Sequence, residues 1–166
     1  MTGSVSCREA LKGDLPEVLR LYAQPGLDDG KVVSLSEAES IFERIAGYPD
    51  YKVYVAVCDG SIVGTFALLI MDNLGHRGTP SAVIEDVAVD PLWHRHGVGK
   101  VMMGYALQIC GTKGCYKLAL SSNLKREQAH AFYEALNFER HGYSFRISFQ
   151  QGAADDGYKR GTEHES

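Results

Sequence analysis

Hydrophobic and polar positions follow two different periods along the chain, and each period predicts its own kind of element. Val53, Val55 and Val57 alternate with polar and small residues up to Asp59-Gly60, a pair that is typical of a two-residue hairpin turn. Other segments place apolar residues three and four positions apart, as an amphipathic helix does. The expected elements are strands at 4–8, 53–57, 62–71, 82–89, 116–121 and 143–149, and helices after Asp14, after Ser36, from 98 to about 111 and at 129–136.

Local signals mark where several of these elements begin and end. Asp14 precedes Leu15-Pro16-Glu17 as an N-cap with an acidic third position, and Ser36-Glu37-Ala38-Glu39 has the form of a capping box. Asn137 closes the last helix as a residue that is tolerated in the left-handed cap. The final strand is expected because large apolar residues alternate with polar ones at Tyr143, Phe145, Ile147 and Phe149.

The length of the chain and this order of elements predict one mixed α/β (α+β) domain. A chain of 166 residues is large enough to bury about two thirds of its unfolded surface in a single core. Residues 1–150 are therefore expected to form one domain. Residues 151–166 are polar, contain glycine and show no periodicity, so they are expected to be a disordered tail.

Composition and charge exclude several classes of protein. No apolar run reaches the ~18 residues that a membrane span needs, and the start of the chain lacks the pattern of a signal peptide. The four cysteines form no Cys-x-x-Cys pair, which suits reduced thiols and predicts a cytoplasmic protein. A net charge of −4 argues against a nucleic-acid partner, because no basic stripe is present to release counterions from a phosphate backbone.

The segment from Ile84 to Lys100 joins a buried strand to a glycine turn and then to the start of a helix. The first N–H groups of a helix lack intrahelical partners and lie at the positive end of the helix dipole, so this turn can hold a phosphate group. It is not a Walker loop, because Val101 follows Gly99-Lys100 and His94 stands where the first glycine is needed. A dinucleotide fingerprint also fails, since Met102 replaces its third glycine.

The loop resembles the acetyl-CoA loop of the GNAT superfamily of N-acetyltransferases, where a strand ending in Val-x-Pro is followed by Arg/Gln-x-x-Gly-x-Gly/Ala. The matching residues are Val89-Asp90-Pro91 and then His94-Arg95-His96-Gly97-Val98-Gly99. His94 stands in the Arg/Gln position, and Arg95 occupies a site that is often glycine. The resemblance implies that main-chain N–H groups grip the pyrophosphate between Arg95 and Lys100, so most of this binding survives both departures.

A second stretch strengthens the resemblance. Ala129-His130-Ala131-Phe132-Tyr133-Glu134-Ala135-Leu136-Asn137-Phe138 is similar to the family's Ala-x-x-Phe-Tyr-x-x-x-Gly-Phe. The resemblance implies a mostly antiparallel central sheet flanked by helices, with a splayed pair of strands that holds acetyl-CoA. It also implies transfer of an acetyl group from acetyl-CoA to a primary amine, a small-molecule acceptor, and a homodimer.

Acetyl transfer to an amine needs a base, because an alkylamine with a pKa near ~10.4 is almost fully protonated at neutral pH. In a regular strand Glu85 shares its face with Val83, Val87 and Val89, where desolvation would raise its pKa and favour it as the base. Asp86 has the opposite parity, but the β-bulge that the family carries here would allow Asp86 to face the cleft instead.

The resemblance assigns further roles around the cosubstrate. Tyr133 falls at the general-acid position that protonates the departing thiolate, although its helical spacing also suits a core aromatic. Arg126 replaces an asparagine that is frequent in the family, so Arg126, Lys125 or Asn123 is expected either to reach the pantetheine or phosphates of the cosubstrate or to form a solvated helix start. The residues assigned to acetyl-CoA are Val87, Ala88, Val89, His94, Arg95, His96, Gly97, Val98, Gly99, Lys100, Asn123, Arg126 and Tyr133.

Other functions remain compatible with the sequence. A protein or peptide N-acetyltransferase would use the same chemistry on a lysine or a chain terminus, and a non-catalytic acyl-CoA-binding regulatory module would keep only the loop. The identity of the acceptor amine is not readable, because the segments expected to shape its pocket form no motif. No metal is expected, since the histidines show no zinc-ligand spacing.

Overall fold

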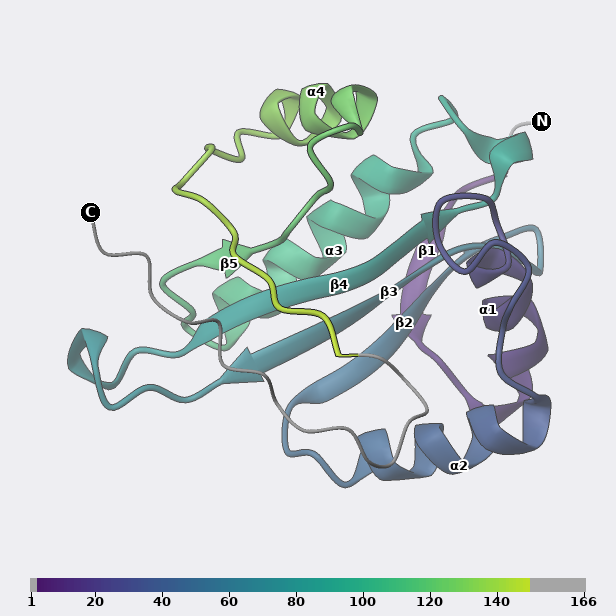
Figure 1. Ribbon diagram of the computed structural model, residues 1–166, viewed down its shortest axis with the longest axis horizontal. Coiled ribbons are helices and arrows are strands. Elements are labelled where there is room, and N and C mark those ends of the chain that lie inside the picture. The colour runs from purple at the N-terminus through teal and green to yellow at the C-terminus, as the bar shows by residue number, and fades with distance from the viewer. Residues whose placement is uncertain (1–2, 150–166) are drawn as a thin grey trace, which may run out of the picture.

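The computed structural model describes residues 3–149 and builds them around a five-stranded sheet in the order β1-β2-β3-β4-β5 (Figure 1). The first four strands are antiparallel to their neighbours, and β5 runs parallel to β4. The strands are β1 (Ser6–Glu9), β2 (Tyr51–Cys58), β3 (Ser61–Met71), β4 (Ser81–Val89) and β5 (Leu118–Ala119). The helices are α1 (Leu15–Tyr22), α2 (Leu35–Ala46), α3 (Val98–Thr112) and α4 (Glu127–Ala135). This is the mixed, mostly antiparallel fold that the sequence predicts.

The β2–β3 hairpin is the longest pairing in the sheet, and it turns where the sequence predicts. Asp59 and Gly60 have φ angles of 48° and 78°, the left-handed conformation that a type I′ turn needs at both central residues. The turn brings Cys58 opposite Ser61. The hairpin is therefore specified locally, by two residues that accept positive φ.

The sheet is covered on both faces, and each face has its own buried cluster (Figure 1). The larger cluster lies under α3 and includes Phe66 and Ile84 from the strands with Met102 and Met103 from the helix. The smaller cluster lies under α1 and joins Val18 and Leu21 to strand residues. Removing such side chains from water is the main favourable contribution to folding. The two faces are thus filled independently.

Two of the predicted helix starts differ in detail. The capping box of α2 is formed by Ser34 and Glu37, not by Ser36 and Glu39: the Ser34 hydroxyl accepts from the Glu37 N–H, and the Glu37 carboxylate accepts from the Ser34 N–H at 3.0 Å. The Asp14 side chain does not cap α1. It accepts instead from the Leu11 N–H at 2.7 Å and pairs with Arg8 at 2.6 Å. The first difference arises because Ser34/Glu37 and Ser36/Glu39 both fit the Ser-x-x-Glu pattern. The second arises because Arg8 pairs with the Asp14 carboxylate.

The predicted final strand is absent. Residues 143–149 form no strand, and β5 contains two residues where six were expected. Alternation of side chains sets which face of a strand is apolar, but a strand also needs a neighbouring edge to pair with. Because the edge offered by β5 is so short, the alternation at the end of the described chain has no partner there. The predicted disordered tail at 151–166 lies outside the described residues.

Candidate active site

Strands β4 and β5 pair over two residues and then part. The pairs are Ala82 with Leu118 and Val83 with Ala119, and β4 then continues to Val89 paired with β3 but not with β5. Both strands run in the same direction, so the gap opens toward their carboxyl ends, next to the glycine loop and α4 (Figure 1). This is the splayed pair that the sequence resemblance implies. Among residues 3–149, no strand pairs with β4 beyond Val83 on the side of β5, so its main-chain groups there can bind an extended ligand arm as a strand would.

A β-bulge lies in β4 at the start of this gap. Opposite the single residue Phe66 of β3, β4 places two residues, Asp86 and Val87, and Asp86 has a φ of 53°. The bulge breaks the regular alternation, so Ile84 and Val87 both pack on the α3 side of the sheet. The expectation that Glu85 shares a face with Val87 and Val89 is therefore wrong.

Both carboxylates of the bulge face the α1 and α2 side of the sheet. Burial raises the pKa of Tyr51 most, and the negative charges of Asp86 and Glu85 raise it further. Burial and then the charge of Asp86 likewise raise the pKa of Tyr22 at the end of α1. Desolvation raises the pKa of Glu85, and the charge of Asp86 raises it further. Desolvation also raises the pKa of Asp86, with a contribution from Asp28. Two neighbouring carboxyls with raised pKa values are better proton acceptors than carboxyls of ordinary pKa.

Sequence reasoning did not assign Tyr22, Tyr51 and Asp28 to the site. By their local pattern, Tyr22 and Tyr51 are ordinary core or strand aromatics and Asp28 is a solvated loop residue. The three residues come from different segments, so no motif links them. The loop between α1 and α2 brings Asp28 toward the carboxylates of β4, as the effect of its charge on Asp86 shows. The sequence signal that could have pointed to this residue is the pair of neighbouring aspartates, Asp28 and Asp29, in the loop.

The glycine loop follows β4 through a short 3-10 turn at Pro91–Trp93 and enters α3 at Gly97. Gly97 has a φ of 80° and Arg95 a φ of 64°, so the chain reverses sharply just before the helix. The first intrahelical hydrogen bond is donated by Val101 N–H to Gly97 O. The N–H groups of Val98, Gly99 and Lys100 precede that bond and point from the helix end, where the dipole favours an anion.

His94 and His96 form hydrogen bonds within the glycine loop and to the end of β4. The His96 N–H donates to Trp93 O and the His94 N–H to Pro91 O, both at 3.3 Å, so the amide of His96 is already used within the predicted gripping range. The His94 ring contacts Val89 O at 3.1 Å, and the His96 ring contacts the carbonyl of His94 at 2.9 Å. These contacts fix the turn between β4 and α3.

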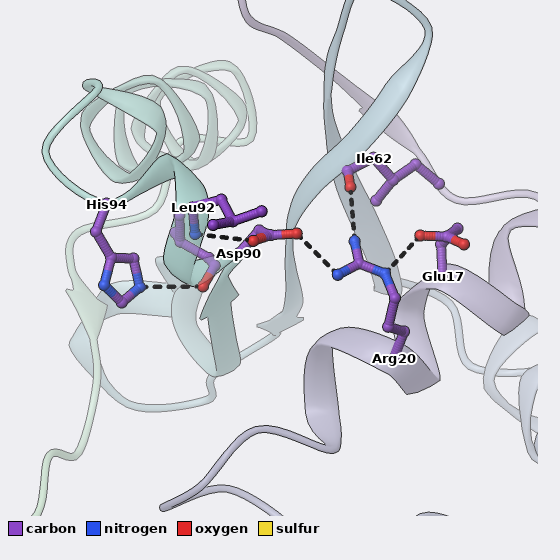
Figure 2. A network of polar contacts seen from close by, with 7 residues as sticks. Glu17, Arg20, Ile62, Asp90, Leu92 and His94 are labelled. Carbon is purple, nitrogen blue, oxygen red and sulfur yellow. Dashed lines mark hydrogen bonds and ion pairs between the residues drawn. The ribbon is translucent and has the colours of Figure 1, made fainter.

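Asp90 joins the glycine loop to the opposite face of the sheet (Figure 2). Its carboxylate accepts from the Leu92 N–H at 2.9 Å and from the guanidinium of Arg20 in α1 at 2.8 Å. Arg20 also contacts Glu17 and the carbonyl of Ile62. Burial alone would raise the pKa of Asp90, but these hydrogen bonds outweigh it and the pKa is lowered. The sequence did not predict this role for Arg20, which lies 70 residues before its partner Asp90 in the chain.

Helix α4 packs against the start of α3 through Gly99. A Cβ atom added at Gly99 would lie 3.0 Å from Cζ of Phe132, tighter than ordinary contacts, so this approach needs glycine. The ring of Tyr133 lies edge-on to Phe132 and Phe138, with centroids 5.2 Å and 5.7 Å apart. Burial raises the pKa of Tyr133, and the charge of Arg126 offsets part of that rise. The phenol is therefore half-buried and protonated at neutral pH.

Asn123 and Arg126 line a cavity of about 260 Å³ together with Lys125 and the α1–α2 loop residues Pro25 and Gly26. The Asn123 side chain accepts from the Lys125 N–H at 2.9 Å, so part of it serves the turn before α4. The cavity brings these cationic side chains beside the loop that carries Asp28. Within residues 3–149, no group of three or more His, Cys, Asp or Glu side chains is arranged to hold a metal ion.

The structure has a left-handed glycine turn at the start of α3, two adjacent carboxyls in the bulge of β4 and a half-buried phenol on α4, and it was compared with known families. A model of the acetyltransferase (GNAT) family matches residues 16–138. The chain belongs to this family. Members of the family use acetyl-CoA as the acetyl donor, so this acetyltransferase is an enzyme of acyl transfer. None of its described helices is long and apolar enough to cross a membrane.

Named relatives of this acetyltransferase act on small amines. Glucosamine 6-phosphate N-acetyltransferase of Trypanosoma brucei brucei is 36% identical over 96 residues, which cover 58% of this chain and just under two thirds, 63%, of that protein. Aminoglycoside N(6')-acetyltransferase type 1 of Stenotrophomonas maltophilia is 27% identical over 123 residues, or 73% of this chain and 76% of that protein. A structure from Agrobacterium tumefaciens str. C58, described as an acetyltransferase, has a TM-score of 0.80 and 31% identity and covers 87% of this chain and 99% of its own.

Proposed function

We propose that this GNAT enzyme moves the acetyl group of acetyl-CoA directly to a primary amine of a small molecule, with an amino sugar as the acceptor class. The observation that carries the proposal is the bulge of β4. Glu85 and Asp86 lie side by side on the face that α1 and α2 cover, next to the point where β4 and β5 part. A base on that face can reach an amine, while a thioester lies along β4.

Glu85 is the proposed base. An acceptor ammonium loses its proton to the Glu85 carboxylate, directly or through one water molecule, and the free amine nitrogen attacks the acetyl carbon. Addition gives a tetrahedral intermediate with an oxyanion, and its collapse breaks the C–S bond while the CoA sulfur takes a proton from the Tyr133 phenol. The surplus proton on the new amide nitrogen then passes, through water, to the Tyr133 phenolate, so the phenol is regenerated. The raised pKa of Glu85 supports this role, because a carboxyl of ordinary pKa is a weak proton acceptor for an ammonium.

The splayed strand and the glycine loop are the proposed seat of the cosubstrate. Main-chain groups of Val87, Ala88 and Val89 would hold the pantetheine arm, and one of their N–H groups would stabilise the oxyanion. The amides of Val98, Gly99 and Lys100 would hold the pyrophosphate, with Arg95 and Lys100 adding positive charge. The open space around a Cβ at Gly97 and its left-handed backbone support a close approach of a ligand to this turn.

The proposed acceptor class rests on charge and on the relatives. Asp28, Glu85 and Asp86 act on one another or on the same tyrosines, so an ammonium group is favoured on this face. Relatives named for glucosamine 6-phosphate and for aminoglycosides both act on amines borne by sugars. The cationic side chains of Lys125 and Arg126 across the cavity leave room for an anionic substituent as well.

A panel of amines tests the proposal. Release of free thiol from acetyl-CoA should be fastest with glucosamine 6-phosphate or an aminoglycoside, and slower with a polyamine, an amino acid and a lysine-containing peptide. Mass spectrometry of the product should show one added acetyl group on nitrogen. Turnover of the peptide alone would identify a protein acetyltransferase, and binding of acetyl-CoA without turnover of any amine would identify a regulatory module.

Replacing Tyr133 with Phe should lower kcat about tenfold to 100-fold. The loss is expected to be moderate because a thiol has a pKa near ~8.5, so its thiolate leaves readily with little help from an acid. The Phe ring keeps the contacts with Phe132 and Phe138, so stability should hold. Tyr105→Phe is the matched control, since Tyr105 packs beside Tyr54 in the core. Equal rates in the two variants would remove Tyr133 from the mechanism.

A further inference from the structure

The glycine loop is held to the fold by polar contacts more than by burial. Between Pro91 and Gly97 every residue is exposed except Trp93, which is partly buried. A segment that removes so little apolar surface from water gains little from the hydrophobic effect. Backbone amides bind an anion well only when the chain keeps them in place, so the contacts that order this loop matter for the proposed pyrophosphate seat.

Asp90 anchors the loop at its first residue. Its N–H donates to the Val63 carbonyl in β3 at 2.9 Å, and its carboxylate caps the turn at Pro91–Trp93 by accepting from the Leu92 N–H. The Asp90 side chain is only 12% exposed, so its negative charge needs a cationic partner within the protein. The guanidinium of Arg20, at 2.8 Å, supplies that charge (Figure 2).

Arg20 reaches the loop from α1 and is itself held at several points. Glu17, three residues earlier in α1, accepts from its Nε at 2.7 Å, and the carbonyl of Ile62 in β3 accepts from its second terminal nitrogen at 3.2 Å. The remaining terminal nitrogen donates to Asp90. A planar guanidinium fixed in this way presents its charge in one direction, so it also restricts where the Asp90 carboxylate can lie.

We propose that Arg20 is a positioning residue for acetyl-CoA, which holds Asp90 and through it the glycine loop, so that the amides at the start of α3 are ordered before the pyrophosphate binds. The role rests on the seat proposed above for the cosubstrate and adds to it a residue from the opposite face of the sheet. Arg20 acts through Asp90, without touching the ligand. Without Arg20, acetyl-CoA has to order the loop as it binds, and this lowers its apparent affinity.

Arg20→Ala tests this role against a matched control, Arg8→Ala. Arg8 pairs with Asp14 at 2.6 Å, and the exposed fractions of these two side chains, 45% and 13%, nearly equal the 46% and 12% of Arg20 and Asp90. Asp14 also accepts from a nearby N–H, that of Leu11. The two ion pairs are therefore alike, but only the second includes a residue of the glycine loop. Both variants should lose similar stability in chemical denaturation, whereas only Arg20→Ala should bind acetyl-CoA more weakly.

Calorimetric titration of the full chain measures the difference in binding. The Kd of acetyl-CoA should rise about tenfold in Arg20→Ala, as it does when the competent loop is populated about a tenth of the time, and should not change in Arg8→Ala. S-acetyl-pantetheine has the thioester arm without the pyrophosphate, so its Kd should be the same in both variants and in the wild type. Asp90→Asn keeps an acceptor for the Leu92 N–H and removes the charge. It should reproduce the loss, and its combination with Arg20→Ala should add nothing.

Hydrogen exchange of the ligand-free enzyme is the second measurement. The N–H groups of Trp93, His94 and His96 are bonded within the loop and should exchange faster in Arg20→Ala than in the wild type or in Arg8→Ala. Unchanged affinity of Arg20→Ala for acetyl-CoA overturns the proposal, and so does an equal loss for acetyl-CoA and S-acetyl-pantetheine.

The titrations also separate this role from the proposed function. They contain no amine, so a failure of Arg20→Ala to differ from the wild type leaves the proposed acetyl transfer standing. A wild type that does not bind acetyl-CoA overturns the proposed seat, and the role of Arg20 with it.

Discussion

Replacing Glu85 with Gln should lower kcat/KM for the amine about 100-fold to 10,000-fold, while acetyl-CoA binds as before. A positioned general base contributes on this scale, and a 100-fold loss corresponds to about 2.7 kcal/mol of transition-state stabilisation. The pH profile should change as well. Wild-type kcat/KM should rise with pH through the raised pKa of Glu85, because only the carboxylate accepts a proton. This rise should be missing in the variant.

Asp86→Asn is the matched comparison. Asparagine accepts the left-handed conformation that Asp86 adopts in the bulge, so the change removes charge and leaves the backbone in place. The charge of Asp86 raises the pKa of Glu85, and its removal should therefore shift the acidic limb of the profile to lower pH with a smaller loss of rate. If Asp86→Asn abolishes turnover and Glu85→Gln does not, the base is Asp86.

Replacing Gly99 with Val should lower kcat/KM for acetyl-CoA about 100-fold. A Cβ at this position already lies 3.0 Å from Cζ and 3.4 Å from Cε2 of Phe132, and the branched side chain adds two methyl groups. Phe132 must move, and α4 with Tyr133 must move with it. The change also crowds the first amides of α3, which are the proposed seat of the pyrophosphate. Calorimetric titration with acetyl-CoA and steady-state rates measure the two effects separately.

Gly104→Ala is the control for helix propensity, because it lies in the same helix and a Cβ there would meet no atom within 4 Å. It should raise the free energy of unfolding by about 0.5–1 kcal/mol and leave acetyl-CoA affinity unchanged. Combining Gly99→Val with Phe132→Leu relieves the packing clash. Recovery of activity in that double variant would assign the loss to α4, and unchanged affinity in Gly99→Val alone would disprove the role given to this contact.

The features that the sequence predicts well are encoded within a few residues. Asp59-Gly60 specifies the hairpin because both residues accept positive φ. The turn of the glycine loop is equally local, since Gly97 itself adopts the left-handed conformation at the start of α3. Asn137 adopts the expected left-handed cap with a φ of 64°. In each case the backbone requirement and the residue that meets it are adjacent in the chain.

The features that the sequence does not predict depend on distant segments. The resemblance implies a bulge in this region, but its place at Asp86 depends on how β4 registers against Phe66 of β3, and it decides where both carboxylates point. Tyr22, Tyr51 and Asp28 act on those carboxylates from three other segments, and no spacing reveals their meeting. The alternation at 143–149 predicts a strand that the structure does not form, because β5 is only two residues long and offers almost no edge for pairing.

The two buried clusters place the donor loop with α3 on one face of the sheet and α1 with α2 on the other. The loop that we assign to the donor belongs to β4 and to α3, whose buried side chains fill one face, whereas α1 rests on the other cluster and α2 packs against β2 on that side. Substitutions in α1, α2 and the loop between them can therefore remodel the acceptor pocket while the donor side keeps its packing, provided that Arg20, which pairs with Asp90 of the glycine loop, is retained. Divergence of acceptor preference among descendants of one ancestral transferase needs no change in how the donor is held.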